Sequence, residues 1–218
     1  MVFYFWLSVA YAEQWCLSDD VNVKHTVNVL VSITGSKNCE DAFRVLKNQK
    51  SLDLSDQELE TIAPLQNFDF SVLLLRNNKI SDISYLQGHT HLKWLDLSYN
   101  PIQGLNTVTF LTSLQTLWLE GVLLSKQDLE PDILCQNEIT HLSLRGSGIS
   151  TVEPLKTCTD LVFLGLANNR IADLTPLNGL KQINTIDLDG NPITVCPESA
   201  VIDLLSKCKA ILKHNEQQ

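Results

Sequence analysis

The chain has 218 residues, of which 44% are hydrophobic and 19% charged, and its formal net charge is −9. These values lie near those of ordinary globular domains and argue against both wholesale disorder and a polytopic membrane protein. The negative charge, without a concentrated stretch of Lys and Arg, disfavours binding to nucleic acid or to an anionic membrane surface.

Residues 1–12 form an uncharged apolar run that ends in Ala10-Tyr11-Ala12, the small-x-small pattern that signal peptidases accept. We expect this segment to be the remnant of a signal peptide, cleaved before Glu13. The alternatives are a buried N-terminal strand and a membrane anchor. Twelve residues reach only about 18 Å as a helix, well short of the hydrocarbon core, so we expect no membrane span.

Residues 13–49 carry two helical patterns, which predict an N-terminal helical cap. Apolar residues spaced by three and four run through residues 20–33 and are followed by Gly35, which suits a helix end. A second short helix is expected to start from Asn38 as its N-cap. Its apolar face is predicted to carry Ala42, Phe43, Val45 and Leu46.

Residues 50–193 repeat one short pattern about seven times. Each repeat contains two aliphatic residues separated by one position, and the pairs follow in steps of 21, 22, 22, 25, 22 and 22 residues. A period of two places both members on one face of a strand, so each coil predicts a short strand, stacked in parallel on its neighbours. The pairs are Leu52/Leu54, Leu73/Leu75, Leu95/Leu97, Leu117/Leu119, Leu142/Leu144, Leu164/Leu166 and Ile186/Leu188.

An asparagine follows the second leucine by three residues in four of these coils: Asn78, Asn100, Asn169 and Asn191. Gln57, Val122 and Ser147 take its place in the others. The turn after each strand leaves backbone donors and acceptors that no strand partner reaches, and an inward Asn side chain can satisfy them. We therefore expect a structural ladder of stacked asparagines.

These residues resemble a known family. The segments LKWLDLSYNPI, LLLRNNKISDISYL and LVFLGLANNRIADLTPL are similar to the leucine-rich repeat, and their 22-residue step resembles its SDS22-like or internalin-like subclass. The resemblance implies an α/β fold, a right-handed solenoid with a parallel sheet on its concave side and short 3₁₀ or extended segments on its convex side. It also implies protein recognition rather than catalysis, with no cofactor.

The fourth coil departs from the pattern, because it has Val122 at the asparagine position and three extra residues. Its return limb is expected to bulge outward. Cys135 in this coil and Cys158 in the next precede their leucine pairs by seven and six residues. Equivalent positions in neighbouring coils lie about 5 Å apart, which suits a disulfide. Two buried free thiols are the alternative.

Residues 194–218 are expected to form a C-terminal helical cap. Its helix is predicted to have Pro197 and Glu198 in the first turn, with Val201, Leu204, Leu205 and Ile211 on the apolar face. Six cysteines permit 15 pairings, and the repeat favours the sequential one, which joins Cys16 to Cys39 and Cys196 to Cys208 in the two caps. The arrangement resembles the cysteine-containing caps of exported bacterial leucine-rich repeat proteins.

No catalytic or metal-binding constellation is convincing. His89 and His91 form an H-x-H pair, but His89 takes the coil position of Phe68 and Leu111, which favours partly buried packing over metal ligation. The segment DLDGNP, residues 187–192, resembles a calcium loop only superficially, because its Gly is misplaced and Asn191 belongs to the ladder. The chain has no G-x-S-x-G or H-E-x-x-H motif, so we expect neither an enzyme nor a metal site.

Binding is therefore expected on the side chains of the sheet that point away from the core. They include aromatic residues over the middle coils, flanked by two arginines: Arg76, Trp94, Tyr99, Trp118, His141, Arg145 and Phe163. Exposed aromatic and Arg side chains dominate the energetics of interfaces, so this cluster is the predicted partner site. The alternative is that some of these rings lie flat on neighbouring residues and bind nothing.

The leading hypothesis is an exported, monomeric, non-catalytic module that holds another protein in its concave sheet. We expect it in a bacterial periplasm, on a cell surface or outside the cell, because the absence of an N-x-[ST] sequon favours a bacterial source over a eukaryotic secreted one. The alternative is an intracellular SDS22-like regulatory scaffold with reduced cysteines.

Overall fold

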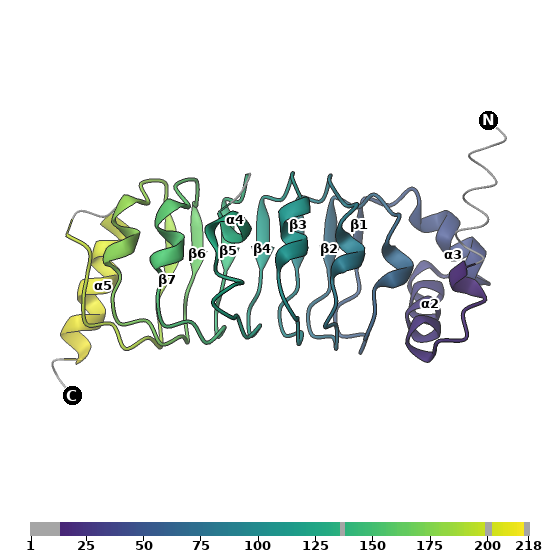
Figure 1. Ribbon diagram of the computed structural model, residues 1–218, viewed down its shortest axis with the longest axis horizontal. Helices are drawn as coiled ribbons and strands as arrows, with labels where there is room; N and C mark the ends of the chain where they lie inside the picture. Colours follow the sequence, from purple (N-terminus) through teal and green to yellow (C-terminus); the bar gives the residue numbers. More distant parts are fainter. Residues whose placement is uncertain (1–13, 136–137, 199–201, 216–218) are drawn as a thin grey trace.

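The computed structural model describes residues 14–135, 138–198 and 202–215, so the expected signal-peptide remnant lies outside the described residues. Seven parallel strands form one sheet in chain order. Figure 1 shows them side by side along an elongated molecule, with the return segments covering one face. The strands are β1 (Ser51–Asp53), β2 (Val72–Leu74), β3 (Trp94–Asp96), β4 (Thr116–Trp118), β5 (His141–Ser143), β6 (Phe163–Gly165) and β7 (Thr185–Asp187).

The register of the sheet keeps equivalent residues of successive coils side by side. Leu73 pairs with Leu95 and Leu95 with Leu117, and the same alignment holds along the whole sheet. Both members of every aliphatic pair are at most 4% exposed. The sequence prediction of a parallel stack of strands with one core face is therefore confirmed.

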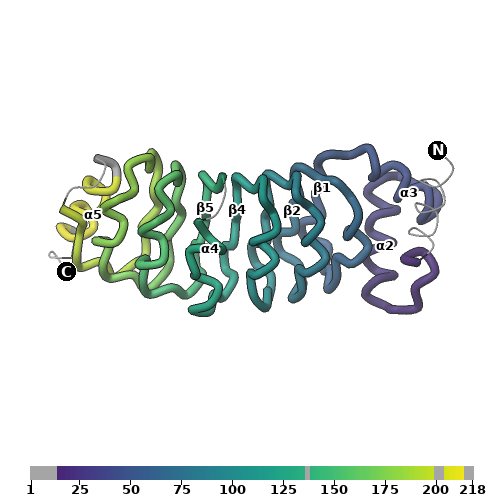
Figure 2. The backbone as a smooth tube through the Cα atoms, turned by 45° about the horizontal axis from the view of Figure 1, so that its top comes forward, coloured from purple at the N-terminus to yellow at the C-terminus, as the bar shows by residue number. Residues whose placement is uncertain are grey.

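The return segments are mostly single turns of 3₁₀ helix that close the core opposite the sheet. In three of them the second residue is a proline, whose fixed φ and missing N–H suit the first turn of a helix. Each has at least one buried aliphatic side chain. Figure 2 shows the backbone winding through successive coils between the helices at the two ends. They are η1 (Ala63–Leu65), η2 (Ser84–Leu86), η3 (Asn106–Phe110), η4 (Glu153–Thr157) and η5 (Thr175–Gly179).

The extra residues of the fourth coil form a helical turn, α4 (Pro131–Leu134), rather than the outward bulge that the sequence predicts. Ile133 and Leu134 are buried, so this segment folds back onto the core. Asp128 is buried beside it and accepts hydrogen bonds from the backbone N–H groups of Leu105 and Ser125, both at 2.9 Å. The insertion is thereby tied to the third coil.

The asparagines bridge neighbouring coils through both ends of their amides. The Oδ1 atom of Asn100 accepts from the backbone N–H of Ile80 at 3.0 Å, while its Nδ2 donates to the carbonyls of Leu75 at 2.8 Å and Leu97 at 3.1 Å. Asn78, Asn169 and Asn191 make the equivalent contacts. The ladder is interrupted in the middle, where Ser147 only donates its hydroxyl to the carbonyl of Leu119 at 2.8 Å and Val122 has no polar side chain.

Two helices, α2 (Val21–Thr34) and α3 (Cys39–Leu46), cover the β1 end of the stack. Gly35 ends α2 in the left-handed conformation at φ 63°, and Asn38 caps α3 by accepting from the N–H of Asp41, as predicted. Val45 was predicted on the apolar face of α3 but is 41% exposed. The helical period places Ala42, Phe43 and Leu46 inward and turns Val45 outward.

The helix α5 (Ile202–Asn215) covers the β7 end. Pro197 and Glu198 were predicted in its first turn but lie outside it, because the chain is still extended where Val195 forms a parallel bridge with Asp173. Lys207 of α5 donates from Nζ to the carbonyl of Ile186 at 2.5 Å. This hydrogen bond satisfies a backbone carbonyl of β7, the strand at the edge of the sheet. None of the helices in the described ranges is long and apolar enough to cross a membrane.

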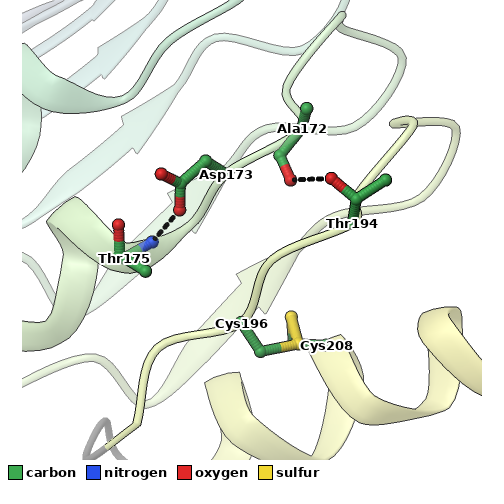
Figure 3. The surroundings of a disulfide bond; sticks show 6 residues. All are labelled: Ala172, Asp173, Thr175, Thr194, Cys196 and Cys208. Carbon is green, nitrogen blue, oxygen red and sulfur yellow. Dashed lines mark hydrogen bonds between the residues drawn. A yellow bond between two sulfur atoms is a disulfide. The ribbon is translucent and has the colours of Figure 1, made fainter.

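Three disulfides tie the stack at its two ends and in its middle. They join Cys16 to Cys39, Cys135 to Cys158, and Cys196 to Cys208, which are the sequential pairs expected from the sequence, and no cysteine remains free. Figure 3 shows Cys208 of α5 bonded to Cys196 in the extended segment beside Asp173 and Thr194. This segment is itself held by the hydroxyl of Thr194, which donates to the carbonyl of Ala172 at 3.3 Å.

Candidate functional site

The candidate site is the outer face of the sheet, which we call the strand face. In each coil it comprises the first and third residues of the strand and the two residues after the second leucine; in the second coil these are Val72, Leu74, Arg76 and Asn77. Alternation along each strand sends the leucines inward and these side chains outward. All seven partner-site residues predicted from the sequence lie on this face.

Two tryptophans pack against each other over β3 and β4. The ring centroids of Trp94 and Trp118 are 5.5 Å apart and the rings meet edge to face at 62°. Trp94 is 38% exposed, while Trp118 is half-buried. The indole Nε1 of Trp118 is buried and has no hydrogen-bond partner in the described structure, although buried N–H groups are usually paired.

A second pair of rings continues the aromatic surface over β5 and β6. His141 and Phe163 are register partners in the sheet, and their rings stack with centroids 6.1 Å apart and planes inclined by 13°. The Nδ1 atom of His141 lies 2.9 Å from the hydroxyl of Thr140, which fixes the imidazole orientation. Four successive strands thus present two ring pairs, a pairing that the sequence did not specify.

Arg76 lies between an aromatic ring and a carboxylate. Its guanidinium carbon is 4.5 Å from the ring centre of Tyr99, and its Nη1 donates to Oε2 of Glu120 at 3.1 Å. The other oxygen of Glu120 accepts from the hydroxyl of Ser143 at 3.1 Å. Partial burial alone would lower the pKa of Arg76, but the hydrogen bond and charge of Glu120 outweigh it and raise this pKa.

Arg145 makes a similar link in the second half of the face. Its Nη1 donates to Oδ2 of Asp187 at 3.1 Å. Both arginines reach a carboxylate two coils away, past an intervening coil with a small residue, Ser98 or Gly165. A Cβ atom at Gly165 would lie 2.8 Å from the hydroxyl oxygen of Ser143, so a larger residue would force Ser143 to shift. The arginines are held before any partner arrives.

Tyr99 has an unusual backbone conformation, with φ at 56°. The equivalent residues Asn77 and Asn168 share it, at φ 54° and 57°, and the fourth, fifth and seventh coils have glycine there. This left-handed turn directs the N–H of each such residue to the next coil, as from Tyr99 to the carbonyl of Glu120 at 2.7 Å. Asn and Gly adopt the conformation at low cost, whereas a bulky residue is strained in it.

Replacing Tyr99 by asparagine is expected to leave the stability unchanged or to raise it by up to about 1 kcal/mol. The relief of backbone strain, about 1 to 2 kcal/mol, offsets the loss of the contact with Arg76, about 0.5 to 1 kcal/mol. Urea unfolding measures the change, and Asn77→Tyr is the reciprocal control, which should destabilise. A loss well above 1 kcal/mol for Tyr99→Asn would show that the ring serves the fold.

The carboxylates that hold the two arginines are not evident from the sequence. Glu120 and Asp187 are 44 and 42 residues from their partners, so no local pattern links them. The available signal was their position in the repeat, because all four residues fall on outward-facing positions once the coils are aligned.

The two histidines of the H-x-H pair point to different surroundings. His89 is fully buried, and the centre of its ring lies 6.2 Å from that of Phe70. Burial lowers the pKa of His89, and this effect outweighs the backbone contacts with Leu86 and Leu65, which raise it. His91 is exposed and its Nδ1 lies 2.9 Å from a carboxylate oxygen of Asp69. Within the described residues, no three or more His, Cys, Asp or Glu side chains are grouped so that they could hold a metal ion.

Comparisons with known proteins agree with this architecture. A family model described as Leucine Rich Repeat matches residues 91–112. Among solved structures, internalin C2 of Listeria monocytogenes is 26% identical, with a TM-score of 0.64 over 80% of this chain and 76% of that one. Internalin InlF of the same organism is 20% identical, with a TM-score of 0.62 over 84% of this chain and 59% of that one, a likeness of fold alone.

Curated relatives match shorter stretches. Leucine-rich repeat and IQ domain-containing protein 3 of Rattus norvegicus is 28% identical over 37% of this chain, and receptor-like protein kinase BRI1-like 3 of Arabidopsis thaliana is 29% identical over 53% of it. The matched stretches span only 13% and 11% of those two proteins. The matches therefore cover only a small part of either relative.

Proposed function

We propose that this leucine-rich repeat protein, internalin-like in its solenoid, is a non-catalytic module that binds another protein on its strand face, the concave side in this kind of fold. Leucine-rich repeats are protein-interaction modules, and internalin-like proteins are generally binding scaffolds without enzymatic activity. In this proposal residues 13–49 and 194–218 are caps, and residues 50–193 form the binding unit.

The observation that carries the proposal is the preorganised aromatic surface over β3 to β6. The Trp94–Trp118 and His141–Phe163 pairs are fixed on a hydrogen-bonded sheet, and Arg76 and Arg145 are held by carboxylates. A surface that is ordered before binding avoids much of the entropy cost of association. Trp, Tyr and Arg are also the residues that most often dominate interface energies.

We further propose that the protein is exported, to a bacterial periplasm, a cell surface or the extracellular space. Three disulfides support this, because cytosolic thiols are kept reduced, and so does the likeness to internalins. The alternative, an intracellular SDS22-like scaffold, requires reduced cysteines. Thiol titration distinguishes these two proposals when the protein is purified from its native source and denatured without reductant. All six cysteines would react in a cytosolic protein, and none would react in the oxidised protein.

The binding proposal is tested with Trp118→Ala. Affinity purification from the native source identifies a partner. Calorimetry then measures the affinity of the purified partner for the parent protein and for the variant. We expect the variant to bind at least about 2 kcal/mol more weakly, roughly thirtyfold, with little loss of stability, because Trp118 lies at the centre of the aromatic surface. Phe110→Ala is the matched control, since Phe110 is 49% exposed but belongs to η3 on the opposite side.

Equal affinities of Trp118→Ala and the parent protein would place the interface elsewhere. A loss of affinity in Phe110→Ala but not in Trp118→Ala would move it to the return segments.

A further inference from the structure

Acidic residues outnumber basic ones on the strand face. Six of its side chains are carboxylates and two are guanidinium groups: Asp53, Asp56, Asp96, Glu120, Asp187 and Asp189, against Arg76 and Arg145. This excess agrees with the net charge of −9 of the whole chain. A surface of one predominant sign attracts partners of the opposite sign and repels those of the same sign.

Neither arginine is available to neutralise further charge. Arg76 is bonded to Glu120 and Arg145 to Asp187, each at 3.1 Å. Asp96 is buried close to Arg76 and accepts the N–H of Ser98. The charge that a partner meets therefore comes from the remaining carboxylates.

Those carboxylates stand at the two ends of the face. Asp53 and Asp56 belong to the first coil and Asp189 to the last, and all three are exposed. They form no ion pair with any cation of the described residues; Asp56 accepts only from the amide of Asn77, and Asp53 from the N–H of Ser55. The aromatic pairs occupy the coils between them.

This arrangement defines the complementary surface of a partner. Seven strands spaced by about 4.8 Å place the two acidic ends about 29 Å apart, with the rings in the middle. Covering an unpaired carboxylate with neutral protein costs free energy, whereas a Lys or Arg opposite it restores the interaction lost with water.

We infer that the strand face binds a polypeptide segment with an apolar or aromatic centre and basic side chains at both ends. The inference rests on the proposed function and adds the chemistry of the partner. The rings supply most of the affinity, and the acidic ends orient the segment and speed its approach.

The probe is a displayed library of random peptides of about twelve residues, long enough to span the face when extended. It is selected on the full oxidised protein, and the binders are then measured individually. We expect selected peptides to carry Lys or Arg on both sides of an aromatic or aliphatic core, and Trp118→Ala to abolish their binding. Their affinity should fall at least about tenfold in the triple variant Asp53→Asn, Asp56→Asn, Asp189→Asn.

The matched control is Asp82→Asn, Asp132→Asn, Asp173→Asn, which removes three exposed carboxylates of the return segments and should leave affinity unchanged. Binders that depend on Trp118 but show no basic excess, and that bind the acidic triple variant equally well, would overturn this inference and leave the proposed function standing. Binders that are all indifferent to Trp118→Ala would overturn both.

Discussion

Replacing Asn100 by alanine is expected to lower the free energy of unfolding by at least about 3 kcal/mol, because several buried backbone groups lose their partners together. The N–H of Ile80 and the carbonyls of Leu75 and Leu97 all bond to this one amide. Each buried group left unsatisfied costs about 1 to 3 kcal/mol. Urea unfolding measures the difference.

Asn184→Ala is the matched control, because Asn184 lies just before β7 and its side chain is exposed. A surface substitution of this kind changes stability by no more than about 0.5 kcal/mol. If the two variants lost the same stability, the ladder would contribute nothing beyond the general cost of removing an amide.

The second large effect is expected on removing the disulfide of the C-terminal cap. With Cys196→Ala and Cys208→Ala, the closed loop of 12 residues opens, which is worth about 3 kcal/mol in the chain-entropy model. In a stack whose coils contact mainly their neighbours, this loss is local. Hydrogen exchange of α5 and β7 should therefore accelerate about a hundredfold, since each 1.4 kcal/mol is a factor of ten.

Exchange is expected to accelerate in α5 and β7 because α5 covers the last coil of the stack. It buries Leu204 and Cys208 against the last coil, and Lys207 pairs the carbonyl of Ile186. The matched control removes Cys16 and Cys39 instead and should accelerate exchange in α2 and α3 only. Uniform acceleration along the chain, with β2 and β3 as fast as β7, would contradict this local account and indicate that the whole solenoid unfolds as one unit.

The sequence was sufficient for the features that repeat. Each aliphatic pair, taken alone, is a weak signal, but seven in register locate every strand, and all of them are found where the spacing places them. The helix ends at Gly35 and Asn38 were predictable for a different reason, because capping depends on local backbone geometry and a few neighbouring atoms.

The features that escaped prediction depend on which of several neighbours a side chain or segment reaches. The contact of Arg76 with Glu120 joins residues two coils apart, and the fold of the inserted residues into α4 depends on the space that Ile133 and Leu134 find in the core. The left-handed turn at Tyr99 was hidden because its residue type argues against it. For the candidate site, the outward-facing residues were predictable from the period of two, but the pairing of the rings was not.

The interruption of the asparagine ladder has a mechanical consequence. Under tension along the stack the coils carry the load in series, so the rod yields first at the boundary with the fewest ties. The boundary between the third and fourth coils has no ladder contact, because Val122 cannot make one. At the next boundary the hydroxyl of Ser147 replaces the amide, and the disulfide between Cys135 and Cys158 crosses it as well. A stretched molecule is therefore expected to open first in the middle of the stack, and reduction of this disulfide lowers the force that opening requires.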